Sequence, residues 1–274
     1  MKQHIKKHRL DRSDGYFISS QSSFSRLFNM ISPRRCDNVV FFKEAINVEK
    51  ILKFRKNNEG VSMTHILVAA ILKTMKEYPN LNSFVLNGRL YKHKDITIST
   101  IVKRELNDDA DELVGKFKFT ESDGIDAVKT KLTKDIEKMR KDKQSDNLLE
   151  KLGKYPSSLL KIVVAIVKFL IKIDKYPASV RAIDPTYSSV FIANLGSIDL
   201  DAPFHHLYEW GTCSIFITMG VIHKDVVVEN NEMKIKDVCN IVFSLDERIG
   251  EGMKFESALK TLKYYLENPE KMED

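Results

Sequence analysis

Hydrophobic and polar residues alternate with two different periods along the first half of the chain. Alternation with a period of two indicates strands, and apolar residues three or four apart indicate helices. Asn87-Gly88 between two short strand patterns is typical of a tight hairpin, and Pro79 ends a strongly apolar helix that we expect to be buried. The pattern predicts strands at 39–42, 83–86, 89–93, 96–102 and around Phe117 and Phe119, and helices from Asn47 to 55, from Ser62 or Thr64 to Tyr78, and from Asp123 or Gly124 to Lys143.

The second half of the chain is richer in strand patterns. Asn230-Asn231 lies between two of them, as in a hairpin. An amphipathic helix over 254–266 closes the chain, just before Asn268-Pro269. The predicted strands are 190–193, 213–221, 226–228, 233–238 and 240–245.

Residues 145–185 differ from their surroundings and are predicted to be a helical insertion in a domain spanning 36–274, which follows an N-terminal arm at 1–35. Between Pro156 and Pro177, lysines form one narrow stripe on a helix that is otherwise apolar. The run is too short for a good membrane span. We consider, in order of preference, a helix packed on the body or on a neighbouring subunit, a lid over an apolar ligand, and a helix lying in a membrane surface.

Composition narrows the class of protein only a little. The chain has 274 residues, of which 43% are hydrophobic and 30% charged, and a net charge of +6. This mild excess suits solubility, and we expect no nucleic-acid partner. Cys36, Cys213 and Cys239 are widely spaced and odd in number, which favours a reduced cytoplasmic location over structural zinc or a disulfide framework. No apolar signal-peptide core follows the basic N-terminus.

Six short motifs occur in a fixed order and resemble segments of one family. They are Tyr78-Pro79-Asn80-Leu81-Asn82, Tyr91 to Ile96, Phe191-Ile192-Ala193-Asn194-Leu195-Gly196, Ile217 to Val228, Ser244 to Gly252, and Leu262 to Pro269. The family is the catalytic domain of the acyltransferase component of 2-oxoacid dehydrogenase complexes, which shares its fold with chloramphenicol acetyltransferase. The resemblance covers about 36–125 and 187–271 and leaves out 145–185.

The resemblance implies an α/β fold, a two-layer sandwich in which helices cover a mixed sheet. It also implies a homotrimer with active sites between subunits. The channel would run between Glu247 of one subunit and the His65–Asn82 region or N-terminal half of its neighbour. His65 itself stands in the first turn of a predicted helix, where a structural histidine is expected.

The family's active-site motif reads Ser-x-Asp-His-Arg-Val-x-Asp-Gly, and its histidine takes a proton from the thiol of CoA or dihydrolipoamide. Here Glu247 stands at the histidine position and Glu251 at the second aspartate. The resemblance implies that Asn194 donates a hydrogen bond to the tetrahedral oxyanion. Alternatively, Asn194 only forms the turn at the end of its strand. Arg248 would pair with an acidic residue such as Glu251, and Gly252 would complete the frame.

Glutamate is a demanding substitute for histidine as a base. A carboxylic acid is ordinarily far more acidic than a thiol, so transfer of a proton from the thiol to the carboxylate is uphill by roughly 6 kcal/mol. A dry channel would recover much of this difference. The simpler interpretation is that Glu247 is salt-bridged, perhaps to Arg248. His206, near Glu209, offers a relocated acid–base pair, although loop histidines beside aromatic residues more often serve packing.

Two main functions therefore remain open at this point. The first is an acyltransferase that moves an acyl group between CoA and an unknown acceptor, with an acyl-CoA thioester as co-substrate and no bound cofactor or metal. The alternative is a non-catalytic relative that binds acyl-CoA or a lipid-like ligand, or acts as a scaffold. Attachment to an anionic membrane through the basic arm and the lysine-striped helix is a third hypothesis.

Overall fold

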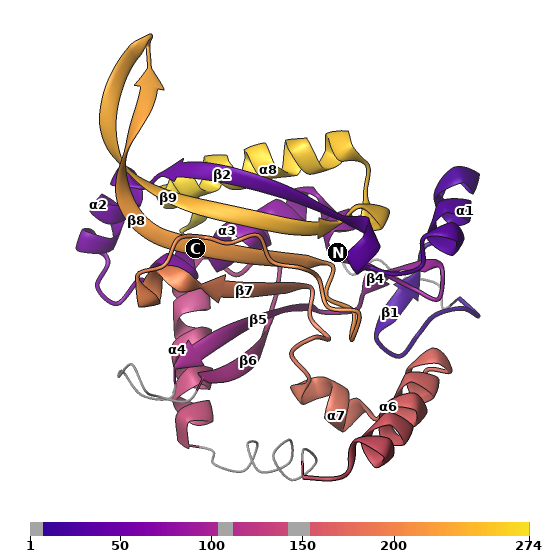
Figure 1. Cartoon of the computed structure of the whole chain (residues 1–274). Helices are drawn as coiled ribbons and strands as arrows, with labels where there is room; N and C mark the ends of the chain where they lie inside the picture. Colours follow the sequence, from indigo (N-terminus) through magenta and orange to yellow (C-terminus); the bar gives the residue numbers. More distant parts are fainter. Residues whose placement is uncertain (1–7, 104–111, 142–153, 274) are drawn as a thin grey trace.

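A computed structural model describes residues 8–103, 112–141 and 154–273, and its central feature is a six-stranded mixed sheet (Figure 1). Strand β7 pairs in parallel with both of its neighbours, and every other pairing in this sheet is antiparallel. In sheet order the strands are β2 (Val39–Asn47), β9 (Glu232–Asp246), β8 (Ile215–Glu229), β7 (Val190–Asn194), β5 (Ile96–Lys103) and β6 (Glu112–Phe119).

A second, three-stranded sheet lies at one end of the molecule, in the order β1 (Gly15–Phe17), β4 (Arg89–His93) and β3 (Ser83–Leu86). The predicted hairpin between β3 and β4 is confirmed. Asn87 and Gly88 both have positive φ, at 51° and 71°, as the tightest hairpin turns require. Strand β1 belongs to the predicted N-terminal arm, so this part of the arm pairs with the body of the protein.

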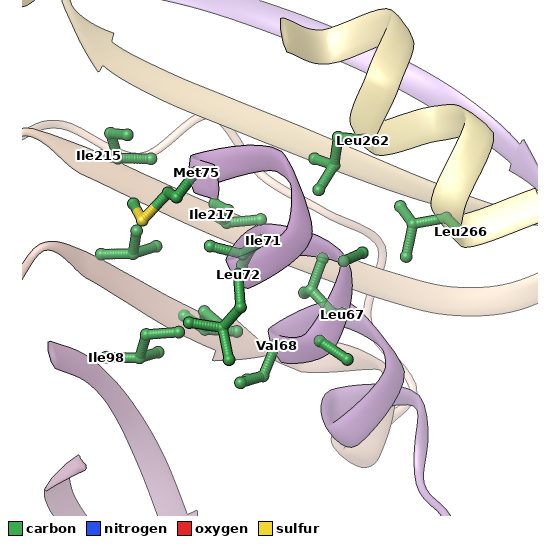
Figure 2. Close-up of a cluster of buried hydrophobic side chains, with 14 of the residues drawn as sticks. Leu67, Val68, Ile71, Leu72, Met75, Ile98, Ile215, Ile217, Leu262 and Leu266 are labelled. Atoms are coloured by element: carbon green, nitrogen blue, oxygen red, sulfur yellow. The ribbon is translucent and has the colours of Figure 1, made fainter. Parts of the chain in front are cut away.

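The helical layer supplies the hydrophobic core on one face of the main sheet. Helix α3 is almost wholly apolar, and its Leu67, Ile71 and Met75 are buried. Figure 2 shows these side chains between the sheet, represented by Ile215 and Ile217, and the C-terminal helix. The helices are α2 (Glu49–Asn57), α3 (Met63–Glu77), α4 (Ile125–Lys141) and α8 (Gly252–Glu267). This arrangement confirms the predicted α/β fold with a mixed sheet covered by helices.

The start of α3 shows why a histidine occurs there. The Ser62 backbone N–H donates to Nδ1 of His65 at 3.1 Å, and the His65 backbone N–H donates to the Ser62 hydroxyl at 3.2 Å. The two residues form a reciprocal capping box. The prediction that His65 is structural is confirmed.

Strands β8 and β9 correct the sequence analysis, which divided each of them into two strands. Each is continuous over 15 residues, with one irregularity between Met219 and Ile222. The polar residues after this point interrupt the apolar alternation because the hairpin leaves the sheet and projects from the body (Figure 1). Its tip is the predicted turn, where Asn230 and Asn231 have φ of 53° and 63°.

The segment predicted as an insertion contains α6 (Ser157–Lys172) and α7 (Ala178–Ile183). Only Ile171 of α6 is buried, and apolar residues such as Ile162 and Phe169 are about three-fifths exposed, at 58% and 61%. Of the preferred expectation, a helix packed on the body or on a neighbouring subunit, packing on the body is therefore not observed for most of this length, and packing on a neighbouring subunit stays a prediction. No helix in the described parts of the chain is long and apolar enough to cross a membrane.

Candidate active site at the end of strand β9

The turn after β9 is held by a buried ion pair between its first and third residues. Asp246 is fully buried, and its carboxylate accepts from Nε and Nη2 of Arg248 at 2.8 and 2.7 Å. Nη1 of Arg248 donates to the carbonyls of Ser32 and Pro33. A two-point pair of this kind fixes orientation as well as charge. Arg248 therefore ties the short helix η4 (Glu247–Ile249) to the N-terminal segment.

Arg248 pairs with an acidic residue, as predicted, but this residue is Asp246, and the suggested partner Glu251 is wrong. Glu251 is exposed and lies 3.3 Å from Lys254 in an (i, i+3) pair. Asp246 is the better partner because it is the N-cap of the turn, buried two residues before the arginine. Gly252 is the first residue of α8, and a Cβ added there would meet no atom within 4 Å, so close packing does not explain this glycine.

A second guanidinium, that of Arg35, approaches the same carboxylate, although no sequence motif predicted it. Nε of Arg35 lies 3.6 Å from Oδ2 of Asp246, and its terminal nitrogens donate to the carbonyls of Tyr208 and Gly211. Burial lowers the pKa of Arg35, although the negative charge of Asp246 acts in the opposite direction. The Pro33-Arg34-Arg35 run carried no signal that one of its arginines would be buried.

Glu247 faces the other way from its two neighbours. Its side chain is exposed and lies on the wall of a cavity of about 610 Å³. The described residues give it no hydrogen bond or ion pair through its side chain. The expected salt bridge between Glu247 and Arg248 is not formed, because the guanidinium of Arg248 is paired with Asp246.

The cavity beside Glu247 lies between α1 (Ser23–Ile31), β2, the η4 turn and the start of α8. Aromatic side chains such as Phe28, Phe42 and Phe255 give it an apolar wall. Asn29 is only 1% exposed, and neither atom of its side-chain amide has a hydrogen-bond partner among the described residues. A neighbouring cavity of about 380 Å³ shares Asn29 and Arg248 with the first, so these two residues stand in the wall between them.

Asn194 lies near the opposite end of the sheet from Glu247. It pairs with Met219, which in turn faces Ile241 in β9, five residues before Asp246. At about 3.3 Å per residue, this offset alone is on the order of 16 Å. The Asn194 amide donates to the Thr64 hydroxyl at 3.3 Å. Asn194 and Glu247 of one chain therefore do not share a site.

The residue before Asn194 also differs from the family motif. The family segment that this strand end resembles reads Thr-Ile-Thr/Ser-Asn-Leu-Gly, with a hydroxyl residue before the asparagine. This chain has Ala193 at that position. Gly196 keeps a structural role, because a Cβ at this position would lie 2.5 Å from the carbonyl oxygen of Gly220. The chain thus keeps a glycine at this crowded point and has no side-chain hydroxyl directly before Asn194.

His206 is exposed in the loop before β8 and takes part in aromatic packing. The His205 ring stacks on His206 and on Phe216, with centroids 4.7 and 3.9 Å apart. The Glu209 carboxylate accepts from the Cys36 backbone N–H at 2.6 Å. Partial burial acts to raise the pKa of Glu209, but the hydrogen bonds from Cys36 outweigh it and lower that pKa. Glu209 is thus engaged with Cys36, and the packing alternative suits the histidine pair better.

The sheet order, the helical layer and the turn after β9 together define a protein with the acyltransferase fold of the chloramphenicol acetyltransferase type. Residues 158–273 match the model of the 2-oxoacid dehydrogenases acyltransferase (catalytic domain), and the resemblance predicted from the motifs is confirmed. This match begins at residue 158, so it includes α6 and α7, which the sequence analysis had set apart from the family pattern.

Solved structures agree on the fold at low sequence identity. A probable dihydrolipoamide acetyltransferase from Listeria monocytogenes superposes with a TM-score of 0.59 at 15% identity, over 92% of this chain and 94% of that one. A chloramphenicol acetyltransferase gives 0.58 at 10% identity, over 92% and 99%. The cubic core of a pyruvate dehydrogenase multienzyme complex gives 0.54 at 15% identity, over 91% and 88%. A sequence search of curated proteins found no match.

Proposed function

We propose that this chain is a CoA-dependent acyltransferase that binds an acyl thioester in the cavity beside Glu247 and uses this carboxylate as the proton acceptor. One observation carries the proposal: Glu247 faces the cavity without a partner, while the residues on both sides of it are buried and paired. A glutamate needed only to hold the turn would be engaged with Arg248, and that role belongs to Asp246.

The proposed reaction is an acyl exchange between two thiols or a thiol and another acceptor. Glu247 takes the proton from the acceptor S–H, and the thiolate attacks the thioester carbonyl to form a tetrahedral oxyanion. The intermediate collapses, the C–S bond to CoA breaks, and Glu247 returns the proton to the departing CoA thiolate. Because Asn194 of the same chain is remote, the oxyanion donor would be Asn194 of a neighbouring chain.

A neighbouring chain would also supply the dry surroundings that a carboxylate base needs. Helix α1 forms one wall of the cavity and exposes large apolar side chains, among them Phe24 at 77% and Ile31 at 71%. Apolar groups gathered this way on a surface usually mark an interface. We propose a homotrimer, in keeping with the resemblance, with α1 and the exposed face of α6 against neighbouring subunits. Sedimentation at the mass of one chain would refute this assembly.

The unpartnered amide of Asn29 supports a ligand in this cavity. Buried polar groups almost always find a partner, and a polar group of a bound thioester or its pantetheine-like arm would satisfy this one. Asn29→Leu should therefore weaken acyl-CoA binding by roughly tenfold, the loss expected for one or two hydrogen bonds. We place the reaction in the cytoplasm, where free cysteines stay reduced.

Acyl exchange between acetyl-CoA and a panel of small thiols tests the proposal. The wild-type protein should turn over, Glu247→Gln should lose about a hundredfold or more in rate, the contribution of a general base, and His206→Ala should not change it. Glu256→Gln is the matched control, since Glu256 is exposed and pairs with Lys260 away from the cavity. Equal turnover by wild type and Glu247→Gln would exclude Glu247 as the base.

A second candidate function is binding of an acyl-CoA or lipid-like ligand without transfer. The observation that favours it is the loss of the hydroxyl at Ala193 together with the replacement of histidine by Glu247. Saturable binding of acetyl-CoA with no turnover over the whole thiol panel would establish this alternative. Absence of both binding and turnover would remove the two functions together.

A further inference from the structure

A third cavity, of about 320 Å³, lies at the edge of the main sheet, beside β5 and β6, and Glu247 is not among its lining residues. Helix α7 forms one wall, and it stands beside β6 in Figure 1. The N-terminal segment just before β1 forms another wall. The volume of this cavity lies in the range of small-molecule sites in proteins. It shares no lining residue with the cavity beside Glu247.

Buried polar atoms without a hydrogen-bond partner gather around this cavity. The parts of the chain that the structure describes contain nine such side-chain atoms, and three of them belong to residues that line it. They are Oδ2 of Asp14, Nε2 of His93 and the hydroxyl of Tyr187. His93 and Tyr187 are 7% and 4% exposed. Orphaned polar atoms are rare in folded proteins, and a cluster of them in one cavity indicates a polar ligand.

Lys116 gives the cavity a positive charge that no carboxylate neutralises at contact distance. Its ammonium donates to the Arg181 carbonyl at 2.9 Å, and no acidic side chain in the described residues forms an ion pair with it. Burial lowers the pKa of Lys116 to about 8, so its side chain is still mostly protonated at neutral pH. An ammonium has three donors, and one hydrogen bond leaves two for a ligand.

The other groups complete a set of donors and acceptors with fixed roles. Burial lowers the pKa of His93 to about 3, and the charge of Lys116 adds to the effect, so the ring is neutral. Burial also raises the pKa of Tyr187, which keeps its phenol protonated and able to donate. The Asp14 carboxylate can only accept when ionised. Lys116 and Tyr187 thus offer donors, and Asp14 offers an acceptor.

We propose that this cavity binds a small hydroxylated or aminated oxyanion, a carboxylate or phosphate held by Lys116 and Tyr187, whose hydroxyl or amine donates to Asp14. The neutral ring of His93 provides a further contact of either kind. The neighbouring ion pairs support this polarity, since Arg181 is already held near Asp14 and Asp174 and Lys118 pairs with Asp95, whereas no described carboxylate pairs with Lys116. The proposal does not depend on acyl transfer at Glu247.

Calorimetric titration of the full chain with malate, which has carboxylates and a hydroxyl, and with inorganic phosphate distinguishes the two sources of the anion. At least one probe should bind saturably, and Tyr187→Phe and Lys116→Met should each weaken that binding roughly tenfold or more, as expected for hydrogen bonds to a charged group. Lys260→Met is the control, because Lys260 is exposed and pairs with Glu256 on α8.

Chemical labelling provides a second measurement that does not require a variant to fold. Trinitrobenzenesulfonate is an anionic reagent that modifies neutral amines, so Lys116 should be labelled faster than the exposed Lys260 at mildly alkaline pH. The probe that binds should protect Lys116 alone. The proposal is overturned if neither probe binds, if the two variants bind like wild type, or if the probe leaves the labelling of Lys116 unchanged.

Discussion

The two sides of the turn after β9 differ sharply although they are one residue apart. On the inner side, Asp246 and Arg248 are buried, paired and tied to the N-terminal segment. On the outer side, Glu247 is exposed on the wall of a large cavity and has no partner among the described residues. The comparison teaches that the residues that hold the shape of the turn differ from the residue that the turn presents to the cavity, so each can be removed without the other.

Removing the inner side should have the largest effect. Arg248→Met leaves the Asp246 carboxylate buried with only the more distant Arg35 beside it, and such a broken pair costs about 3–5 kcal/mol of unfolding free energy. Urea unfolding measures the loss. Lys254→Met removes an exposed partner of Glu251 and should cost less than about 1 kcal/mol. A similar small cost for Arg248→Met would mean that the inner pair does not hold the turn.

Restoring histidine on the outer side should raise the rate of acyl exchange. Imidazole is a stronger base than a carboxylate, so Glu247→His should accelerate turnover by about tenfold to a hundredfold. Because the side chain is exposed, the unfolding free energy should change by less than about 0.5 kcal/mol. A variant that is folded but no faster than wild type would indicate that position 247 does not meet the thiol.

Arg35 extends the inner side and should matter less than Arg248. Its Nε is 3.6 Å from Asp246, and its loss would leave the Tyr208 and Gly211 carbonyls without their donor. We expect Arg35→Met to cost roughly 1–3 kcal/mol in unfolding free energy, the cost of buried acceptors left unsatisfied. Urea unfolding of both variants compares their losses of unfolding free energy. A larger loss for Arg35→Met than for Arg248→Met would contradict the geometry.

Glu251 should give the smallest effect of the four changes. Its carboxylate is exposed and meets only Lys254. Glu251→Gln should therefore change the unfolding free energy by no more than about 0.5 kcal/mol, as for most exposed ion pairs. Thermal unfolding at low and high salt measures it. A loss of unfolding free energy comparable to that of Arg35→Met would mean that Glu251 helps to hold the turn.

Local patterns in the sequence were sufficient for most of the fold. Pro79, Asn87-Gly88 and Asn230-Asn231 act through the backbone of their own residues, so the ends of elements near them were predictable. The length of β8 and β9 was not predictable, because their outer halves leave the sheet and lose the apolar alternation of the inner halves. The exposure of α6 also depends on what lies around it, which its own sequence does not contain.

The site was predictable in part. The resemblance identified the turn and the unusual Glu247, but the partner of Arg248 depends on which carboxylate is buried beside it. Arg35 and Asn29 lie more than 200 residues away from the turn in sequence and reach it only through the tertiary fold. The cavity with Lys116 brings together the N-terminal segment, β6 and α7, and no local motif marks it.

The central claim is that Glu247 of one chain acts with Asn194 of a neighbour, and mixed assemblies test it most directly. Glu247→Gln and Asn194→Ala chains are prepared separately, and acyl exchange is measured before and after they are unfolded and refolded together in equal amounts. If sites form between subunits, about a quarter of them regain both residues and turnover rises toward a quarter of the wild-type rate. Turnover no higher than the mean of the two separate variants would contradict a shared site.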